Sequence, residues 1–263
     1  MLPSSDPTGT SIQTLYVVPS PVDAAESSTD AATAPVSTAA ASSSAAAETS
    51  AVEASPSETV STDAATVSGK ATSYGGNLDG GNCMFSGYTL PSNIFGTAFS
   101  GQNWDASKCG VCVQVTGPNG KPIKAMVVDK CPECDPTHLD LFANAYTAVS
   151  GQSPGIIPIT YSIVPCGITS PIVLKNKSGT SPYWFSMQVM NANVGVAKLE
   201  VSTDGGKSWK GTTRMDYNFF ENSSGFGTST VDVKVTSVNG GVVTVKNVGV
   251  ASDSKTTAGS NFA

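Results

Sequence analysis

Six cysteines, all confined to one region of the chain, limit what it can fold into more than any other feature. They are Cys83, Cys109, Cys112, Cys131, Cys134 and Cys166. An even number of clustered cysteines predicts disulfides formed in an oxidising compartment. The alternative is zinc, because the four central cysteines form two Cys-x-x-Cys pairs with spacing near that of zinc ribbons. Zinc would leave Cys83 and Cys166 unused, so we favour disulfides, although spacing alone cannot select the pairing.

The composition favours a β-rich extracellular protein. Of the 263 residues, 39% are hydrophobic and only 13% are charged, and the chain contains 26 Gly and 16 Pro. Such a chain is long enough for two ordinary domains. No apolar run of about 18 residues is present, so we predict no membrane-spanning segment.

The net charge of −6 does not describe the region that we expect to fold. Eight acidic residues lie between Asp6 and Asp63, before the first basic residue, Lys70. The remainder has 14 basic and 12 acidic residues, which argues against a nucleic-acid partner.

Residues 1–66 are dominated by Ser, Ala and Thr, with scattered Pro. A segment of this kind cannot bury enough apolar surface to offset its chain entropy. We therefore predict a disordered and O-glycosylated stalk. We also expect that a secretory signal has been removed before Met1, which makes the protein secreted.

The segment Val127–Leu141 contains the strongest candidate for a functional site. Asp129 follows a short apolar strand, and Asp140 lies between two leucines, beside the only histidine, His138. A carboxylate held against apolar surface favours its protonated form and is a candidate proton donor. Alternatively, Asp129 caps a turn and Asp140 caps a helix that starts at Phe142.

Three motifs of this region resemble those of expansins, loosenins and family-45 glycoside hydrolases. They are Ala-Thr-Ser-Tyr-Gly-Gly (71–76), Asp-Lys-Cys-Pro-Glu-Cys (129–134) and His-Leu-Asp-Leu (138–141). The second is most similar to fungal expansin-like proteins and loosenins. The resemblance spans residues 69–250 and implies a double-psi β-barrel domain followed by a family-63 carbohydrate-binding module. Within the first domain, Leu141, Ala145 and Val149 recur at helical spacing, which predicts one short helix that ends at Gly151.

The resemblance also implies roles for particular residues. Thr72, Tyr74 and His138 would line a sugar groove, with Asp140 as the retained acid and Asp129 beside it. The implied disulfides are Cys83–Cys109, Cys112–Cys166 and Cys131–Cys134. Cys131 replaces a tyrosine of bacterial expansins.

The chain departs from the hydrolases at Gly76, which occupies the position of their catalytic base. Inverting hydrolysis requires a second carboxylate to activate water. Asp79 is near in sequence, but it lies in a glycine-rich loop, and we do not expect it to replace the base.

The second half of the chain has short alternating strands with turns at Asp204-Gly205-Gly206 and Asn239-Gly240-Gly241, which suggests a β-sandwich. The predicted fold is therefore all-β: a six-stranded double-psi β-barrel with a short helix, then an immunoglobulin-like β-sandwich. The expected segments are a stalk (1–66), a barrel (67–168), a linker (169–174), a sandwich (175–252) and a flexible tail (253–263).

Alternation in the segment Tyr183–Val189 places Phe185, Met187 and Val189 in the core and Trp184, Ser186 and Gln188 on the opposite face. An exposed Trp suggests stacking on glucose rings. By resemblance, Tyr183, Trp184 and Tyr217 would form the carbohydrate-binding platform. We assign Trp209 to the core. Asn176 and Asn222 begin glycosylation sequons.

The sequence thus predicts a secreted, monomeric, expansin-like protein that loosens wall polysaccharide without hydrolysis. Its partner would be cellulose, xyloglucan, xylan or chitin, and we expect no cofactor, metal, membrane or nucleic acid. The alternatives are a weak endoglucanase or lytic enzyme that uses Asp140 alone, and a non-catalytic wall-binding protein.

Overall fold

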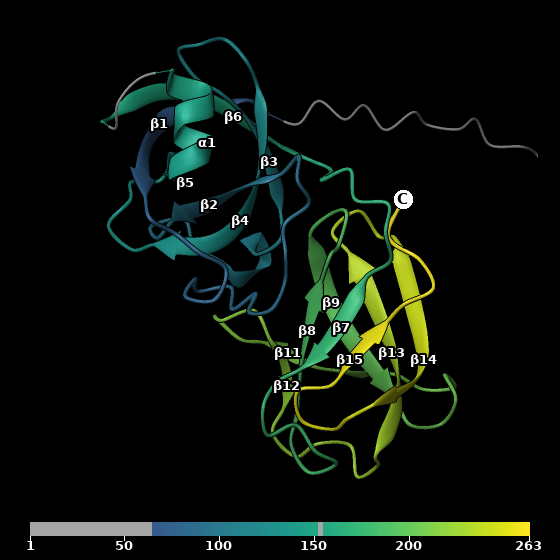
Figure 1. Ribbon diagram of the computed structural model, residues 1–263. Helices are drawn as coiled ribbons and strands as arrows, with labels where there is room; N and C mark the ends of the chain where they lie inside the picture. The colour runs from purple at the N-terminus through teal and green to yellow at the C-terminus, as the bar shows by residue number, and fades with distance from the viewer. Residues whose placement is uncertain (1–64, 152–154) are drawn as a thin grey trace, which may run out of the picture. The chain divides into compact units, whose positions relative to one another are not determined.

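The computed structural model describes residues 65–151 and 155–263. Nearly all of the predicted stalk lies outside these residues. The described chain contains a closed barrel and two further sheets, drawn in blue-teal and in green-yellow in Figure 1. This confirms the predicted all-β class. No helix among the described residues is long and apolar enough to cross a membrane.

Six strands close the barrel in the order β1-β5-β2-β4-β3-β6. Their bounds are β1 Val67–Tyr74, β2 Phe95–Ser100, β3 Cys112–Thr116, β4 Ile123–Cys131, β5 His138–Phe142 and β6 Ile157–Val164. The pairs β1–β5 and β2–β4 are parallel, and the other neighbours are antiparallel. Alternate side chains point inward, so small and branched residues such as Ala71, Val113 and Leu139 fill the barrel.

One short helix, α1 (Ala143–Ser150), follows β5 directly. It ends at Gly151, whose φ of 64° is the left-handed conformation that favours glycine at this position. Tyr146 and Val149 of the helix are buried in the same core as the barrel interior. The helix predicted to end at Gly151 is therefore confirmed, and it packs against the barrel (Figure 1).

All six cysteines form disulfides, and the pairing is the one that the expansin resemblance implies. Cys83 is bonded to Cys109, Cys112 to Cys166 and Cys131 to Cys134. Each sulfur is therefore committed to another sulfur, which removes the zinc-ribbon alternative.

The remaining strands form a sandwich of two sheets, with orders β10-β9-β13-β14 and β11-β12-β8-β7-β15. Their bounds are β7 Val173–Asn176, β8 Phe185–Met190, β9 Val196–Ser202, β10 Lys210–Gly211, β11 Thr213–Arg214, β12 Phe220–Asn222, β13 Thr230–Ser237, β14 Val242–Gly249 and β15 Lys255–Thr257. Residues from both sheets share one core, which includes Phe185, Leu199 and Val233. Phe185, Met187 and Val189 lie in this core, as the alternation predicted.

We had expected the opposite face of β8 to be open to solvent, but the structure shows that Ser186 and Gln188 on this face are covered and fully buried. Gln188 Nε2 donates to the Cys83 carbonyl oxygen at 2.8 Å, and Ser186 Oγ donates to Glu221 Oε1 at 2.9 Å. The alternation was correct, but it could not show that a barrel residue and a neighbouring strand contact this face.

The predicted linker and tail also require correction. Ile172 is fully buried, and β7 begins at Val173, so the end of the linker 169–174 belongs to the sandwich. In the predicted flexible tail 253–263, β15 pairs with β7, and Phe262 is only 5% exposed within the sandwich core. These residues are ordered because they complete the edge and the core of the five-stranded sheet.

Trp209 was also misplaced by the sequence analysis. Its side chain is only partly buried and does not belong to the sandwich core. The Lys234 ammonium lies 4.5 Å from the centre of its ring. A cation–π contact of this kind stabilises a Trp at the surface without full burial.

Candidate functional site

Two neighbouring barrel strands bring the predicted groove residues together. In the parallel pair β1–β5, Thr72 lies opposite Asp140, and Lys70 lies opposite His138. Because side chains alternate along a strand, Thr72 and Tyr74 share one face of β1, and His138 and Asp140 share one face of β5. This face is opposite to the one that carries the buried Leu139 and Leu141.

The Thr72 hydroxyl connects the histidine to the acid. Thr72 Oγ1 donates to Asp140 Oδ1 at 2.5 Å and lies 2.9 Å from His138 Nε2. A hydroxyl has a single proton, so a Thr72 that donates to Asp140 must accept from a protonated Nε2. The three side chains thus form a directed chain of hydrogen bonds that ends on the carboxylate.

Burial raises the pKa of the Asp140 carboxyl above its ordinary value, although the hydrogen bond from Thr72 and the charge of His138 oppose this rise. Burial, together with the charge of Lys70, lowers the pKa of His138. Both shifts favour the uncharged form of the side chain, and the protonated form of Asp140 is the one that can donate a proton.

Asp129, in β4, is fixed by donors on both of its oxygens. Oδ1 accepts from the backbone N–H groups of Asn82 at 2.6 Å and Lys130 at 2.8 Å, and Oδ2 accepts from the Tyr74 hydroxyl at 3.2 Å. Burial and the charge of Asp129 together raise the pKa of Tyr74. Tyr74 therefore remains a hydrogen-bond donor at every physiological pH.

Strand β2 lies between the two carboxylates and forms the floor of the site. Ala98 pairs with Asp129 on one side and with Asp140 on the other. It packs with the Cys131–Cys134 disulfide and Tyr74. Because the Ala98 side chain is small, it leaves room between the side chains of Asp129 and Asp140. We use "groove" below for Thr72, Tyr74, Asp129, His138 and Asp140.

Gly76 stands beside aromatic rings that fill the space a side chain would need. A Cβ atom at Gly76 would lie 2.3 Å from Tyr74 Cζ and 2.4 Å from Phe142 Cε1. The two rings contact each other edge to face, with centroids 5.5 Å apart. A carboxylate at this position would require both rings to move.

The second set of predicted residues lies in the sandwich. Tyr183 is 79% exposed, and Trp184 and Tyr217 are partly exposed. The Lys177 ammonium lies 5.5 Å from the Trp184 ring centre and 5.7 Å from the Tyr217 ring centre, so these two rings are neighbours. The Tyr217 hydroxyl donates to Glu221 Oε1 at 2.8 Å, which fixes the ring.

A solved structure of a known protein matches both the barrel and the sandwich. The apo expansin of Clavibacter michiganensis superposes with a TM-score of 0.68 and 31% identity, over 75% of this chain and 98% of that protein. This chain belongs to the expansin family. A variant of the same Clavibacter expansin, solved in complex with cellohexaose, matches with a TM-score of 0.67 and 30% identity, over 75% of this chain and 98% of that protein.

Curated relatives of this expansin come from several kingdoms. Expansin-like protein 5 of Dictyostelium discoideum is 26% identical over 194 residues, which are 70% of this chain and 81% of that protein. Expansin-YoaJ of Bacillus subtilis is 35% identical over 138 residues, which are 52% of this chain and 58% of that protein. No protein-family model matches the chain.

The sequence did not predict three groups that contact the groove residues or the aromatic residues of the sandwich. The Asn82 backbone N–H holds Asp129, Lys177 lies over the aromatic rings, and Glu221 joins Tyr217 to Ser186. A backbone donor carries no sequence signal, and Lys177 lies in a stretch that we noted only as a sequon.

The structure contradicts the sequon at Asn176. Its side chain is 2% exposed, and Nδ2 donates to the carbonyl oxygens of Gly249 and Ala251. A glycan on this nitrogen would replace buried hydrogen bonds, so Asn176 is structural. Asn222 is partly exposed in β12 and stays a prediction.

Proposed function

We propose that this expansin binds wall polysaccharide through the sandwich and the groove and loosens it without cleaving glycosidic bonds. The observation that carries the proposal is the pairing of a retained acid with a missing base. Asp140 has the partners and the raised pKa of a proton donor, whereas Gly76 has no side chain and no room for one. An inverting mechanism needs both groups.

A β-linked glucan such as cellulose is the partner that we propose first. A Clavibacter expansin variant crystallised with cellohexaose supports this choice. The exposed ring of Tyr183 and the neighbouring rings of Trp184 and Tyr217 offer apolar faces on which glucose rings can stack. Xyloglucan, xylan and chitin present similar ring faces and are secondary candidates.

The proposal includes an extracellular location and two domains. Three disulfides suit an oxidising compartment, which supports secretion. We place the barrel domain at 67–168. We extend the carbohydrate-binding domain from Ile172 to the C-terminal residues, since Ile172 and Phe262 belong to its core and β15 to its sheet. We propose that it acts as a monomer without a cofactor and is most similar to fungal members.

The test is a paired assay on one cellulose sample, with the intact chain, Asp140→Asn and Asp79→Asn. It records tensile weakening and the release of reducing ends over time. We expect weakening without reducing ends, abolished by Asp140→Asn and kept by Asp79→Asn. Reducing ends that rise with time and disappear in Asp79→Asn would overturn the proposal, because Asp79 would then be the missing base.

The binding role of the aromatic rings is tested separately. Trp184→Ala should weaken adsorption to cellulose about fivefold, since one lost aromatic contact contributes ~1 kcal/mol. Trp209→Ala is the matched control, because Trp209 is also a partly exposed Trp of the sandwich. Equal losses in both variants would remove the platform assignment.

A further inference from the structure

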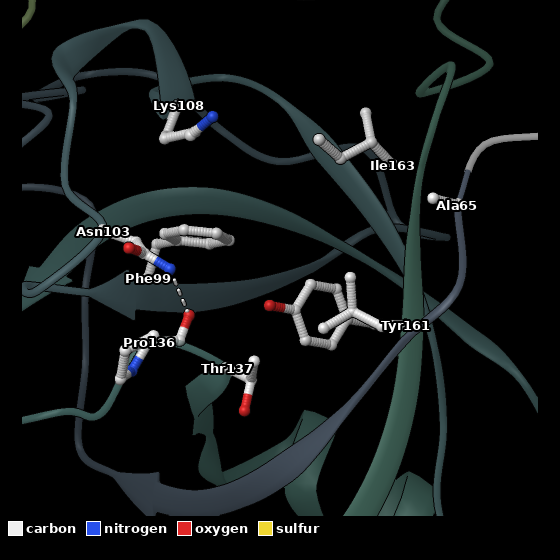
Figure 2. Close-up of a pocket in the computed structure, with 9 residues that line it drawn as sticks. Ala65, Phe99, Asn103, Lys108, Pro136, Thr137, Tyr161 and Ile163 are labelled. Atoms are coloured by element: carbon white, nitrogen blue, oxygen red, sulfur yellow. Dashed lines mark hydrogen bonds between the residues drawn. The ribbon is translucent and has the colours of Figure 1, made fainter.

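A second cavity opens in the barrel, apart from the groove. It has a volume of about 660 Å³ and is lined mainly by Val67, Phe99, Lys108, Pro136, Tyr161 and Ile163 (Figure 2). None of the five groove residues lines it. Its size lies within the range of cavities that hold small organic ligands. Nothing in the proposed polysaccharide function uses it.

Two aromatic rings form the inner wall of this cavity. Phe99 of β2 and Tyr161 of β6 are 7% and 5% exposed, and their ring centres lie 6.4 Å apart at an interplanar angle of 86°. Edge-to-face rings leave faces and edges available to a third ring. The wall therefore suits a planar aromatic ligand.

The Tyr161 hydroxyl is one of the polar groups that line the cavity. Figure 2 shows it pointing into the space between Phe99 and Pro136. Within residues 65–151 and 155–263 this hydroxyl has no hydrogen bond to another side chain or to the backbone. Burial raises the pKa of Tyr161, so the hydroxyl stays protonated. Tyr161 is not among the described residues whose buried polar atoms lack a partner, so its hydroxyl reaches solvent in the cavity, and a polar atom of a ligand could take the place of that water.

Lys108 supplies a positive charge at the rim. It ends the short 3-10 helix Ala106–Lys108, and its ammonium lies 6.0 Å from the Phe99 ring centre. Across the described part of the chain it forms no salt bridge. The nearby Asp105 carboxylate instead accepts the backbone N–H of Ser107 at 2.6 Å. The charge of Lys108 helps to lower the pKa of the Asp105 carboxyl, but the two groups form no direct ion pair, so the ammonium can still contact an anion.

Besides Tyr161, three polar side chains line the cavity: Asn103, Lys108 and Thr137. Asn103 Nδ2 is committed to the Pro136 carbonyl oxygen at 2.9 Å, the bond drawn in Figure 2. A glucose unit carries several hydroxyls that would lose their hydration here, whereas an aromatic acid carries its polar atoms at its two ends. We propose that this cavity binds a planar aromatic carboxylate of the hydroxycinnamate type, with its ring against Phe99 and Tyr161 and its carboxylate at Lys108.

The experiment titrates the full chain with 4-hydroxycinnamate, followed by calorimetry and ligand-observed NMR. We expect saturable binding with a dissociation constant of about 1 mM or tighter, from the usual affinity per atom of small ligands. The neutral 4-hydroxycinnamamide, of nearly the same shape, should bind at least about tenfold more weakly, because charge-assisted bonds are the stronger ones.

Variants locate the site. Lys108→Met should weaken the acid about tenfold and leave the amide unchanged, and Tyr161→Phe should weaken both severalfold. Lys210→Met, which removes an exposed charge from the sandwich, is the matched control. A melting temperature of Lys108→Met equal to that of the intact chain shows that the variant is folded.

Three results would overturn the inference: no saturation by the acid at 20-fold the expected dissociation constant (about 20 mM), equal affinity for acid and amide, or equal losses in Lys108→Met and Lys210→Met. Because no arm measures wall loosening, failure here leaves the proposed function untouched, and the reverse also holds.

Discussion

The proton on Asp140 is controlled by groups that act in opposite directions. Burial favours the protonated carboxyl, and the Thr72 hydroxyl, itself bonded to His138, favours the charged form. The result is a raised pKa in a side chain that remains reachable from solvent. A small change at Thr72 would therefore change the acid without touching it.

The raised pKa makes the contribution of Asp140 to stability depend on pH. The folded protein holds this proton at pH values where the unfolded chain has released it, so the free energy of unfolding falls as pH rises from the ordinary pKa through the raised one. Below the ordinary pKa, the carboxyl is protonated in both the folded and the unfolded chain, so Asp140 does not lower the free energy of unfolding. Asp140→Asn should thus raise the melting temperature at neutral pH and leave it nearly unchanged near pH 3, as calorimetry across pH would show.

Asp135→Asn is the control with the opposite sign. The Lys70 ammonium lowers the pKa of Asp135, so this carboxylate stabilises the fold above its ordinary pKa and loses that effect in acid. Asp135→Asn should therefore lower the melting temperature slightly at neutral pH. If Asp140→Asn raised the melting temperature by the same amount at every pH, the raised pKa of Asp140 would be contradicted.

At the scale of elements, the C-terminal residues are the part that sequence patterns describe least well. Lys255–Thr257 carries no apolar alternation, yet β15 pairs with β7. Phe262 then closes the sandwich core. Propensity is local, whereas this strand exists because an edge of a distant strand is available to it.

Phe262→Ala should reduce the free energy of unfolding by about 3–5 kcal/mol, the usual cost of removing a buried Phe. Urea unfolding followed by fluorescence measures this loss. Lys255→Thr, an exposed substitution in β15, should change stability by less than about 0.5 kcal/mol. If Phe262→Ala costs no more than Lys255→Thr, the tail is as loose as its composition suggested.

Other elements were predictable because their signals are local or are carried by motifs. The helix stop at Gly151, the core face of β8 and the pairing of groove residues on β1 and β5 all follow from periodicity or from motif resemblance. The burial of Gln188 and Asn176 was not predictable. Both depend on hydrogen bonds to residues at least 70 positions away.

At the scale of the whole molecule, the three disulfides should contribute unequally to stability. Closing a longer loop removes more entropy from the unfolded chain, so Cys112–Cys166, with a separation of 54, should contribute about 4 kcal/mol, and Cys131–Cys134, with a separation of 3, about 2 kcal/mol. Double Cys→Ala variants, compared by urea unfolding, test the order. Cys83–Cys109, with a separation of 26, should fall between them.

The reverse order would mean that native packing around the groove, and not loop closure, sets the contribution of each disulfide. The Cys131–Cys134 bond is the one that packs beneath the groove, against Ala98 and Tyr74. Removal of the Cys131–Cys134 disulfide should therefore reduce wall loosening strongly while it lowers the free energy of unfolding only modestly. Loosening and unfolding measured on the same variant separate these two effects.

Strand β1 also determines how the molecule bears mechanical load. It is hydrogen-bonded on both sides, to β5 and to β6, and the chain enters the barrel through it at Val67. Tension applied through the preceding residues pulls along the strand and shears two ladders at once, so their bonds must break together and not one after another. If the proposed work in a wall loads the molecule through these residues, the force therefore acts on a strand that is held by a ladder of hydrogen bonds on each side.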